Sequence, residues 1–388
     1  MSELKTGIKM HVQVHRRISE IPAARWDALI DDSNPFLRHD FLDALESEDC
    51  VRSDYGWTPH HLSLRAGDEL IGAIALYLKG NSHGEFVFDW AWANAWEQAG
   101  HAYYPKLLAA IPYSPVSGPR LLVGNGDDAD ARKALLARAL RDQADRLGLS
   151  SVHVNFTDQH DSAALAADDW LHREDTQFHW RNRGWPDFEA FLAALTAKKR
   201  KNIRQERAQV GQAGIRCTMK HGDEVADEDW SAVHRLYVAT FEDHGNLPVL
   251  TEGFFRRLAS AMPKNIVICE CRHGEQLIAM ALFLRSDVTL YGRYWGTQAD
   301  VPSLHFEACY YQGIDYCLRH GLKSFEPGAQ GEHKIARGFL PTPTHSFHYL
   351  PDPGFREAVA DYLSRERMAR HAYRTELLSH SPYRGTGE

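Results

Sequence analysis

The chain repeats one pattern in its two halves, and this repeat limits the folds open to it more than any other feature. Residues 67–76, GDELIGAIAL, resemble residues 274–283, GEQLIAMALF, and each segment is a polar turn that leads into a β-compatible apolar run. Residues 146–152, RLGLSSV, resemble residues 319–325, RHGLKSF, and each predicts a helix stopped by a glycine and followed by a short strand. Self-similarity of this kind reports architecture, so we expect two related halves.

The segments between these motifs complete the repeat. An aromatic segment follows each apolar run, at residues 86–92 and 291–295, and we predict that each forms a strand antiparallel to that run. Apolar residues at helical spacing then predict a helix before the last strand of each half. The expected order is strand, strand, helix, strand. The first half carries an extra aromatic stretch at residues 101–119.

The length of the chain favours two domains. A chain of 388 residues with 44% apolar and 25% charged residues is longer than one core usually serves. We predict an α/β (α+β) fold with two domains, residues 1–160 and 161–388, each a mixed central sheet flanked by helices. The second would carry the active site.

Composition excludes several classes of protein. The formal net charge of -8 argues against general binding of DNA or anionic lipid. The longest apolar run, residues 70–78, is about half of a membrane-spanning helix, and residues 1–10 lack an apolar signal segment. Six cysteines without a CxxC pair favour a reducing compartment. We therefore expect a cytoplasmic protein without membrane insertion; the sequence leaves its oligomeric state open.

One segment is strongly basic. Residues 197–207 read AKKRKNIRQER, which predicts a helix with many cations. We interpret it as a solvated helix face in preference to a phosphate-binding or RNA-binding patch.

The order of elements in the second half predicts a site. Residues 291–295 would form one strand, residues 306–320 a crossover helix and residues 322–327 a second, parallel strand. Such crossovers are right-handed, and ligands favour the carboxyl ends of the strands. The segments RYWG and FEPGAQGEHK should therefore meet, although about thirty residues separate them in the sequence.

The second of these segments has the composition of a functional loop. Pro327 ends the strand, Gly328 and Gly331 permit close approach of the backbone, and an acid, an imidazole and an amine follow at residues 332–334. A solvated turn of the same composition is the competing interpretation.

The sequence lacks the motifs of several other kinds of active site. The 22 histidines include no HExxH pair, and the cysteines are not spaced as zinc ligands, so we predict no metal site. The sequence contains no GxSxG elbow, no GxxxxGK[ST] loop and no Rossmann glycine fingerprint.

These residues resemble a known family. Residues 304–341, LHFEACYYQGIDYCLRHGLKSFEPGAQGEHKIARGFLP, look like the FemAB-like predicted N-acyltransferases of the peptidoglycan biosynthesis and recognition type. The resemblance extends over nearly the whole chain, with support from residues 34–36, residues 56–62 and the basic helix. The family is related to the GCN5-related N-acetyltransferases (GNAT), so the resemblance implies two tandem GNAT-like domains.

The resemblance also implies acyl, acetyl or aminoacyl transfer to an amine, such as a cell-wall precursor, an amino sugar or a peptide. No permanently bound cofactor is implied. The Gln/Arg-x-x-Gly-x-Gly/Ala turn that holds the pyrophosphate of acetyl-CoA is absent, because residues 207–211 have one residue too many between arginine and glycine. Acyl-CoA, a carrier protein and a charged tRNA therefore all stay open as donors.

Acyl transfer assigns roles to the two meeting segments. A base must take the proton of the amine, and hydrogen-bond donors must stabilise the oxyanion. We predict Glu307 or Glu332 as the base, with His333 as the alternative. The predicted residues that bind substrate or acyl donor are Arg293, Tyr294, Trp295, His305, Glu326, Gln330, Lys334 and Arg337.

A second class of function stays open. A duplicated transferase fold can serve as a non-catalytic module that recognises cell-wall or peptide ligands. The first half has no equivalent of GAQGEHK after residue 152, so only the second half looks catalytic.

Overall fold

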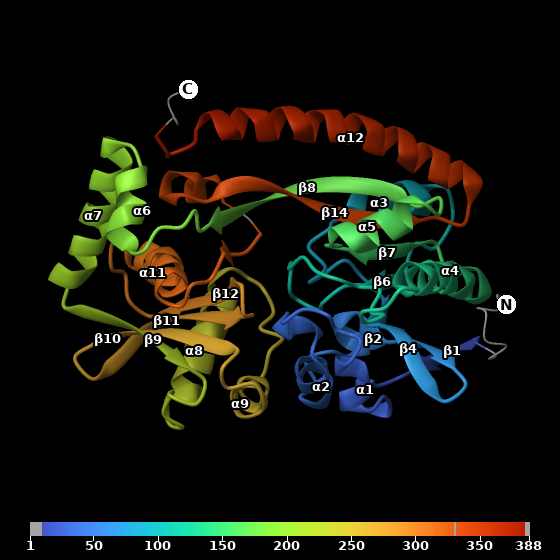
Figure 1. Ribbon diagram of the computed structural model, residues 1–388, viewed down its shortest axis with the longest axis horizontal. Coiled ribbons are helices and arrows are strands. Elements are labelled where there is room, and N and C mark those ends of the chain that lie inside the picture. Colours follow the sequence, from blue (N-terminus) through green and yellow to red (C-terminus); the bar gives the residue numbers. More distant parts are fainter. Residues whose placement is uncertain (1–9, 330, 385–388) are drawn as a thin grey trace. The chain divides into compact units, whose positions relative to one another are not determined.

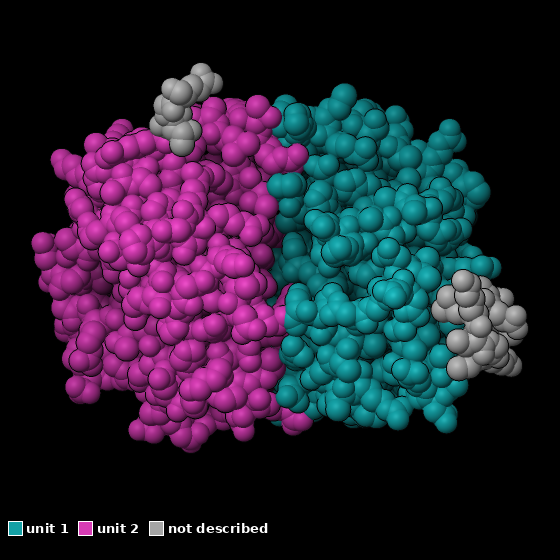
Figure 2. Space-filling view, in the orientation of Figure 1, with its two compact units in different colours: residues 1–32, 36–175, 343–372 teal, residues 33–35, 176–342, 373–388 magenta. Residues whose placement is uncertain are grey.

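The computed structural model describes residues 10–329 and 331–384, which belong to two compact units (Figures 1 and 2). Unit 1 comprises residues 1–32, 36–175 and 343–372, and unit 2 comprises residues 33–35, 176–342 and 373–388. The division lies near residue 175, not at the predicted residue 160, and a late segment returns to unit 1. The predicted domains, as pieces that fold independently, stay a prediction.

Unit 1 contains two groups of strands. The strands β1 (Met10–His15), β3 (His61–Ala66) and β4 (Glu69–Ile74) form an antiparallel sheet. The second group is mixed: β6 pairs in parallel with β7, and the other pairs are antiparallel. Its strands are β2 (Trp57–Pro59), β5 (Leu76–Lys79), β6 (Lys106–Ala109), β7 (Val152–Asn155) and β14 (Leu340–Tyr349, of which residues 343–349 belong to unit 1). Its helices are α1 (Ala23–Asp27), α2 (His39–Ser47), α3 (Trp90–Gln98), α4 (Ala129–Leu147), α5 (Gln159–Ala166) and most of α12 (Pro353–Ser379).

Unit 2 is also built on a mixed sheet, with strand order β8-β13-β12-β11-β10-β9. Only β12 and β13 pair in parallel within this order. The strands are β8 (Leu171–Arg181, of which residues 176–181 belong to unit 2), β9 (Ile215–His221), β10 (Ile266–His273), β11 (Gln276–Arg285), β12 (Thr289–Thr297) and β13 (Ser324–Glu326). The helices are α6 (Phe188–Ala194), α7 (Ala197–Gln212), α8 (Asp229–Asp243), α9 (Glu252–Ala261), α10 (Leu304–Phe306), the π-helical turn η4 (Glu307–Tyr311), α11 (Gln312–Arg319) and the 3-10 helix η5 (Glu332–Arg337).

The predicted repeat is present in the structure. The hairpins β3–β4 and β10–β11 correspond, and in each unit a helix joins two parallel strands: α4 between β6 and β7, and α11 between β12 and β13. Gly148, in the left-handed conformation, ends α4, and Gly321 follows α11 with the same conformation, as the sequence predicts. The α/β fold class with mixed sheets is confirmed.

One expectation about the elements is wrong, and another is confirmed. Residues 86–92 do not form a strand, because α3 begins at Trp90, where alanines alternate with the aromatic residues. In the first half, the strand that follows the apolar run is β6. It lies within residues 101–119, the stretch that the repeat leaves as an extra insertion. The basic helix predicted over residues 197–207 is α7, and Leu195 and Thr196 have extended backbone between α6 and α7.

The core of unit 2 lies between its sheet and α11. Phe325 on β13 is fully buried there, and Gly313 on α11 permits the close approach, because a Cβ at Gly313 would lie 2.4 Å from the Phe325 ring. Figure 1 shows α8 on the opposite face of the same sheet, where α8 contacts β11 and β12. The helices thus enclose β12 and β13, whose ends the sequence predicts to carry the site.

The contact of β12 with α8 yields a test of this packing. A Cβ at Gly296 would lie 2.4 Å from the backbone oxygen of Leu236. Gly296→Ala should therefore lower the free energy of unfolding by about 1–3 kcal/mol, measured by urea denaturation. Gly211→Ala is the matched control, because a Cβ at Gly211, near the end of α7, would meet nothing within 4 Å. Equal stability of the two variants would contradict this account.

Candidate functional site

The two strands predicted to meet do so, and then they separate. In the parallel pair β12–β13, Thr289, Leu290 and Tyr291 lie opposite Ser324, Phe325 and Glu326. Pro327 then ends β13, while β12 continues to Thr297 in its pairing with β11. Among the strands that the structure describes, none pairs with the other edge of β12 from Gly292 onward.

A cavity of about 140 Å³ lies at this separation. It is lined by Ala281, Leu282, Phe283, Gly292, Arg293, Tyr294, Trp295, His305, Cys309, Tyr310 and Pro327. Four of the predicted site residues, Arg293, Tyr294, Trp295 and His305, are therefore brought together. Cys309 and Tyr310 were not predicted. Their spacing one helical turn beyond His305 is the signal that would have found them.

Aromatic and imidazole rings gather beside this cavity. The ring of His305 lies 5.4 Å from that of Trp295, 5.3 Å from that of Tyr310 and 6.5 Å from that of His333. A 2.9 Å hydrogen bond joins the Tyr310 hydroxyl to Nε2 of His333. Burial lowers the pKa of His305 to about 4, with smaller contributions from His333 and Lys334. His305 is therefore neutral at neutral pH.

Glu307 is held by an ion pair. Its buried carboxylate accepts two 3.1 Å hydrogen bonds, from Nε and Nη2 of Arg207, and one of 2.7 Å from Gln312. Burial raises the pKa of Glu307, and Arg207 opposes this shift. Because its oxygens are engaged by these donors, Glu307 is poorly arranged to take a proton from a substrate.

The guanidinium of Arg337 is likewise held by partners within unit 2. Its Nη2 donates a 2.8 Å hydrogen bond to Glu206 and its Nη1 a 2.9 Å hydrogen bond to the His333 carbonyl, while its guanidinium stacks 3.4 Å above the Phe306 ring. The Tyr311 hydroxyl also donates to Glu206. Arg337 thus fixes η5 against α7.

Lys334 holds the glycine loop. Its Nζ donates a 2.9 Å hydrogen bond to the Gly328 carbonyl, and Gly328 and Gly331 both have positive φ angles. Burial lowers the pKa of Lys334 to about 8. Glu332 is exposed and accepts a 2.5 Å hydrogen bond from the Tyr373 hydroxyl. Gln330, also predicted to bind substrate, lies outside the described residues.

Glu326 has the most unusual carboxyl group of the predicted set. It is the last residue of β13, directly before Pro327. Burial raises the pKa of Glu326 to about 7, although Arg181 and Arg293 act to lower it. Its Oε2 is buried and has no hydrogen-bond partner among the residues that the structure describes. A carboxyl with a pKa near neutrality is suited to proton transfer at physiological pH.

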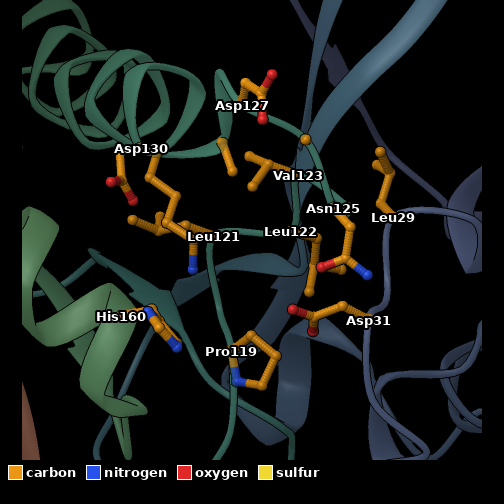
Figure 3. A pocket seen from close by; sticks show the side chains of 14 residues that line it. Leu29, Asp31, Pro119, Leu121, Leu122, Val123, Asn125, Asp127, Asp130 and His160 are labelled. Carbon is orange, nitrogen blue, oxygen red and sulfur yellow. The ribbon is translucent and has the colours of Figure 1, made fainter.

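Unit 1 has a different cavity, of about 310 Å³, around the start of α4 (Figure 3). Asp31, Asp127 and Asp130 line it, and its lysine, Lys133, is paired with Asp161 at 2.5 Å. This concentration of carboxylates disfavours phosphate binding, although the start of α4 would otherwise attract an anion.

Solved structures share this fold. FemX is 10% identical, with 88% of this chain and 98% of that chain covered and a TM-score of 0.53. The C-terminal domain of a putative lysylphosphatidylglycerol synthetase from Agrobacterium fabrum is 11% identical, with 89% and 96% covered and a TM-score of 0.54. L-PGS from Bacillus licheniformis is 11% identical, with 86% and 98% covered and a TM-score of 0.51. Identities this low show a shared fold only.

The family of this chain is shown by its match to a protein-family model. The FemAB-like model, described as peptidoglycan biosynthesis/recognition, matches residues 17–385. This chain belongs to the FemAB-like family. The predicted family is thus confirmed. No curated protein sequence matches the chain. Among the described residues, no helix is long and apolar enough to cross a membrane.

The ion pair of Glu307 permits a test of its role. If Glu307 fixes α7 against η4, Glu307→Ala should lower the free energy of unfolding by about 2–4 kcal/mol, because it leaves Arg207 half-buried without its partner. Arg207→Met combined with Glu307→Ala should recover part of this loss, as a double-mutant cycle of thermal or urea unfolding would measure. Strictly additive effects of the two changes would contradict a direct pair.

Proposed function

We propose that this chain is an N-acyltransferase that moves an acyl or aminoacyl group to an amine, in the cavity between β12 and the end of β13. The observation that carries the proposal is the cavity lined by polar and aromatic side chains at the place where β13 ends and β12 continues. The family description, peptidoglycan biosynthesis/recognition, supports an acceptor of the cell-wall precursor or peptide type. The name of the putative lysylphosphatidylglycerol synthetase with the same fold supports aminoacyl transfer in particular.

The proposed chemistry uses the groups around the cavity. The amine nitrogen attacks the acyl carbon, and the bond from this carbon to the sulfur or oxygen of the donor breaks. Hydrogen-bond donors that line the cavity stabilise the oxyanion that forms on the acyl oxygen. Glu326 accepts the proton that the amine loses, directly or through a water molecule.

Tyr310 is the proposed acid. It lines the cavity, and burial raises the pKa of its hydroxyl, so it stays protonated at neutral pH. The leaving group takes this proton. His333, hydrogen-bonded to Tyr310 at 2.9 Å, orients the hydroxyl.

The other predicted residues receive positioning or binding roles. Trp295, Tyr294 and His305 line the space for the acyl group or acceptor, and Arg293 supplies a cation beside it. Lys334 and Arg337 were predicted to hold a carboxylate or phosphate. Their contacts with Gly328 and Glu206 favour a role in fixing the loop and η5.

The donor is proposed to carry phosphate groups, as acyl-CoA, acyl carrier protein and charged tRNA all do. The start of α7 presents exposed cations, among them Lys198, Lys201 and Arg204. The helix packs on both η4 and η5, which carry site residues. Residues 207–211 lie inside α7 and therefore do not form a pyrophosphate loop.

Transfer can be measured directly. The purified protein should convert an amine acceptor, such as a cell-wall precursor peptide or an amino sugar, to its acylated product with one of acetyl-CoA, longer acyl-CoAs, acyl carrier protein or charged tRNA. Mass spectrometry detects the product, and a thermal shift detects donor binding. A raised melting temperature with an acceptor but no product with any donor would instead indicate the non-catalytic recognition module.

Glu326→Gln should lower kcat by at least about a hundredfold if Glu326 is the base. In the wild-type protein kcat/KM should rise with pH through about 7, as Glu326 ionises, and the variant should lose this limb of the profile. The control is Glu332→Gln, which changes an exposed carboxylate on the following loop.

A stability measurement separates this role from a structural one. The folded pKa of Glu326 lies above its ordinary value of 4.5, so its contribution to stability is full below pH 4.5 and lost as pH rises through 7. The melting temperature of Glu326→Gln relative to wild type should therefore increase from pH 5 to pH 8. Full activity of Glu326→Gln, with loss in Glu332→Gln, would contradict the assignment.

A further inference from the structure

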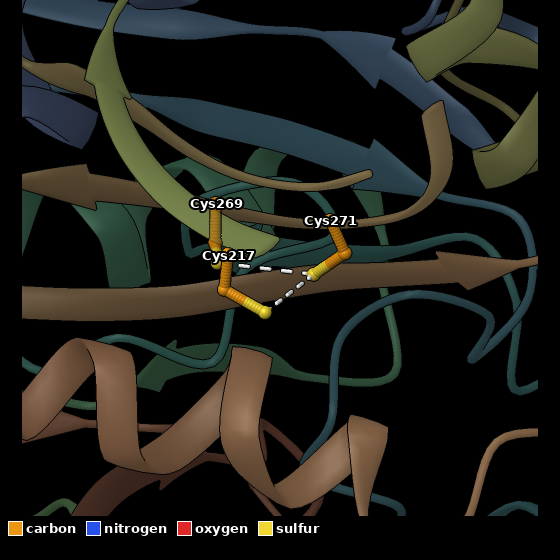
Figure 4. A group of neighbouring side chains, drawn as sticks. All are labelled: Cys217, Cys269 and Cys271. Atoms are coloured by element: carbon orange, nitrogen blue, oxygen red, sulfur yellow. Dashed lines mark hydrogen bonds between the residues drawn. The ribbon is translucent and has the colours of Figure 1, made fainter. Parts of the chain in front are cut away.

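Three cysteines far apart in the sequence meet on one face of the unit 2 sheet (Figure 4). Cys217 lies on β9, and Cys269 and Cys271 lie on β10. The antiparallel register sets Cys217 opposite Cys271, and Cys269 points to the same face because it is two residues away. The Sγ atoms of Cys217 and Cys271 are 3.4 Å apart, and those of Cys269 and Cys271 are 4.0 Å apart. All three sulfur atoms lie within 4.8 Å of one another.

The cluster is enclosed on most sides. Cys269 and Cys271 are 0% exposed and belong to the core, and Cys217 is half-buried on β9, the last strand in the order of this sheet. The turn η4 contacts β10, and α7 contacts β9. Within residues 10–329 and 331–384, no fourth histidine, cysteine or carboxylate ligand atom joins the group at this spacing.

The spacing of the sulfur atoms fits a metal ion. With metal–sulfur bonds of about 2.3 Å, three thiolates around one ion have sulfur atoms about 3.8–4.0 Å apart. The distances from Sγ of Cys271 to those of Cys217 and Cys269, 3.4 and 4.0 Å, lie close to these values, so small side-chain rotations suffice. Thiolates select soft ions, chiefly Cu⁺ and Zn²⁺. The competing explanation for the cluster is that the three cysteines act as small hydrophobic side chains that fill the core.

We propose that Cys217, Cys269 and Cys271 bind one thiophilic metal ion, Cu⁺ with three thiolates or Zn²⁺ with a water molecule as its fourth ligand. Each thiol that binds loses its proton to solvent. The ion would cross-link β9 to β10 beneath η4, whose Cys309 and Tyr310 line the cavity of the proposed active site. Its role would be to stabilise this side of unit 2.

The cysteines of this cluster do not form a recognisable motif in the sequence. Two of its members form a Cys-x-Cys pair on one strand, and the third is 54 residues away from Cys271. The prediction of no metal site therefore rested on spacing alone, whereas pairing of β9 with β10 creates the group.

Metal titration of the full-length, reduced protein tests the proposal. Zn²⁺ is titrated against a chromophoric chelator, Cu⁺ against bathocuproine disulfonate without oxygen, and Co²⁺ serves as a spectroscopic probe. We expect one ion per chain, a thiolate-to-metal charge-transfer band with Co²⁺, and a higher melting temperature with the bound ion. The ion with the lower dissociation constant, Zn²⁺ or Cu⁺, is the one that the site prefers.

Matched variants complete the test. Cys217→Ser and Cys271→Ser should each weaken binding by more than about tenfold and abolish the rise in melting temperature. Cys317→Ser is the control, because Cys317 is another buried free thiol of the same core outside the cluster. Cys217 lies on the edge strand and is half-buried, so its variant should fold. Failure of all three ions to bind the wild-type protein, or unchanged affinity in Cys217→Ser, overturns the proposal. Because the readout is binding, the outcome does not depend on the proposed transferase activity.

Discussion

The close packing of α11 on β13 is the constraint on which the rest of unit 2 depends. Gly313 has no side chain to keep the helix away from Phe325, and Phe325 is fully buried beneath it. This contact fixes the short strand β13 beside β12, and Pro327 ends it after three residues. Because β12 continues and β13 does not, a cavity arises where the two strands part.

The helix α7 secures the two helical turns beside this cavity. Its adjacent residues Glu206 and Arg207 reach different turns: Glu206 pairs with Arg337 on η5, and Arg207 pairs with Glu307 on η4. Partly buried ion pairs of this kind define an arrangement more than they stabilise it, since desolvation offsets much of the attraction. The basic face that dominates the sequence of α7 is exposed. Glu206 and Arg207, on its other side, are the residues that hold η5 and η4 in place.

Much of the fold was open to prediction from local patterns. The antiparallel pair of β11 and β12, the glycine-stopped helices and the parallel pair of β12 and β13 each depend on residues close in sequence, and all are present. The aromatic segment at residues 86–92 misled the prediction because tryptophan and phenylalanine suit strands, whereas the intervening alanines favour the helix that forms. The extended backbone of Leu195 forms a bridge with Tyr383 near the end of the chain, a contact between distant segments that local patterns do not predict.

Local patterns were enough to predict that RYWG and the loop after β13 are neighbours, because one crossover helix connects two strands in only one favoured way. Which side chains of these segments are held by partners depends on tertiary contacts. Glu307 and Arg207 are 100 residues apart, and their pairing engages the carboxylate of a predicted base. Burial at the end of β13 raises the pKa of Glu326 to about 7. Charge partners and burial come from distant segments, and local patterns carry no record of either.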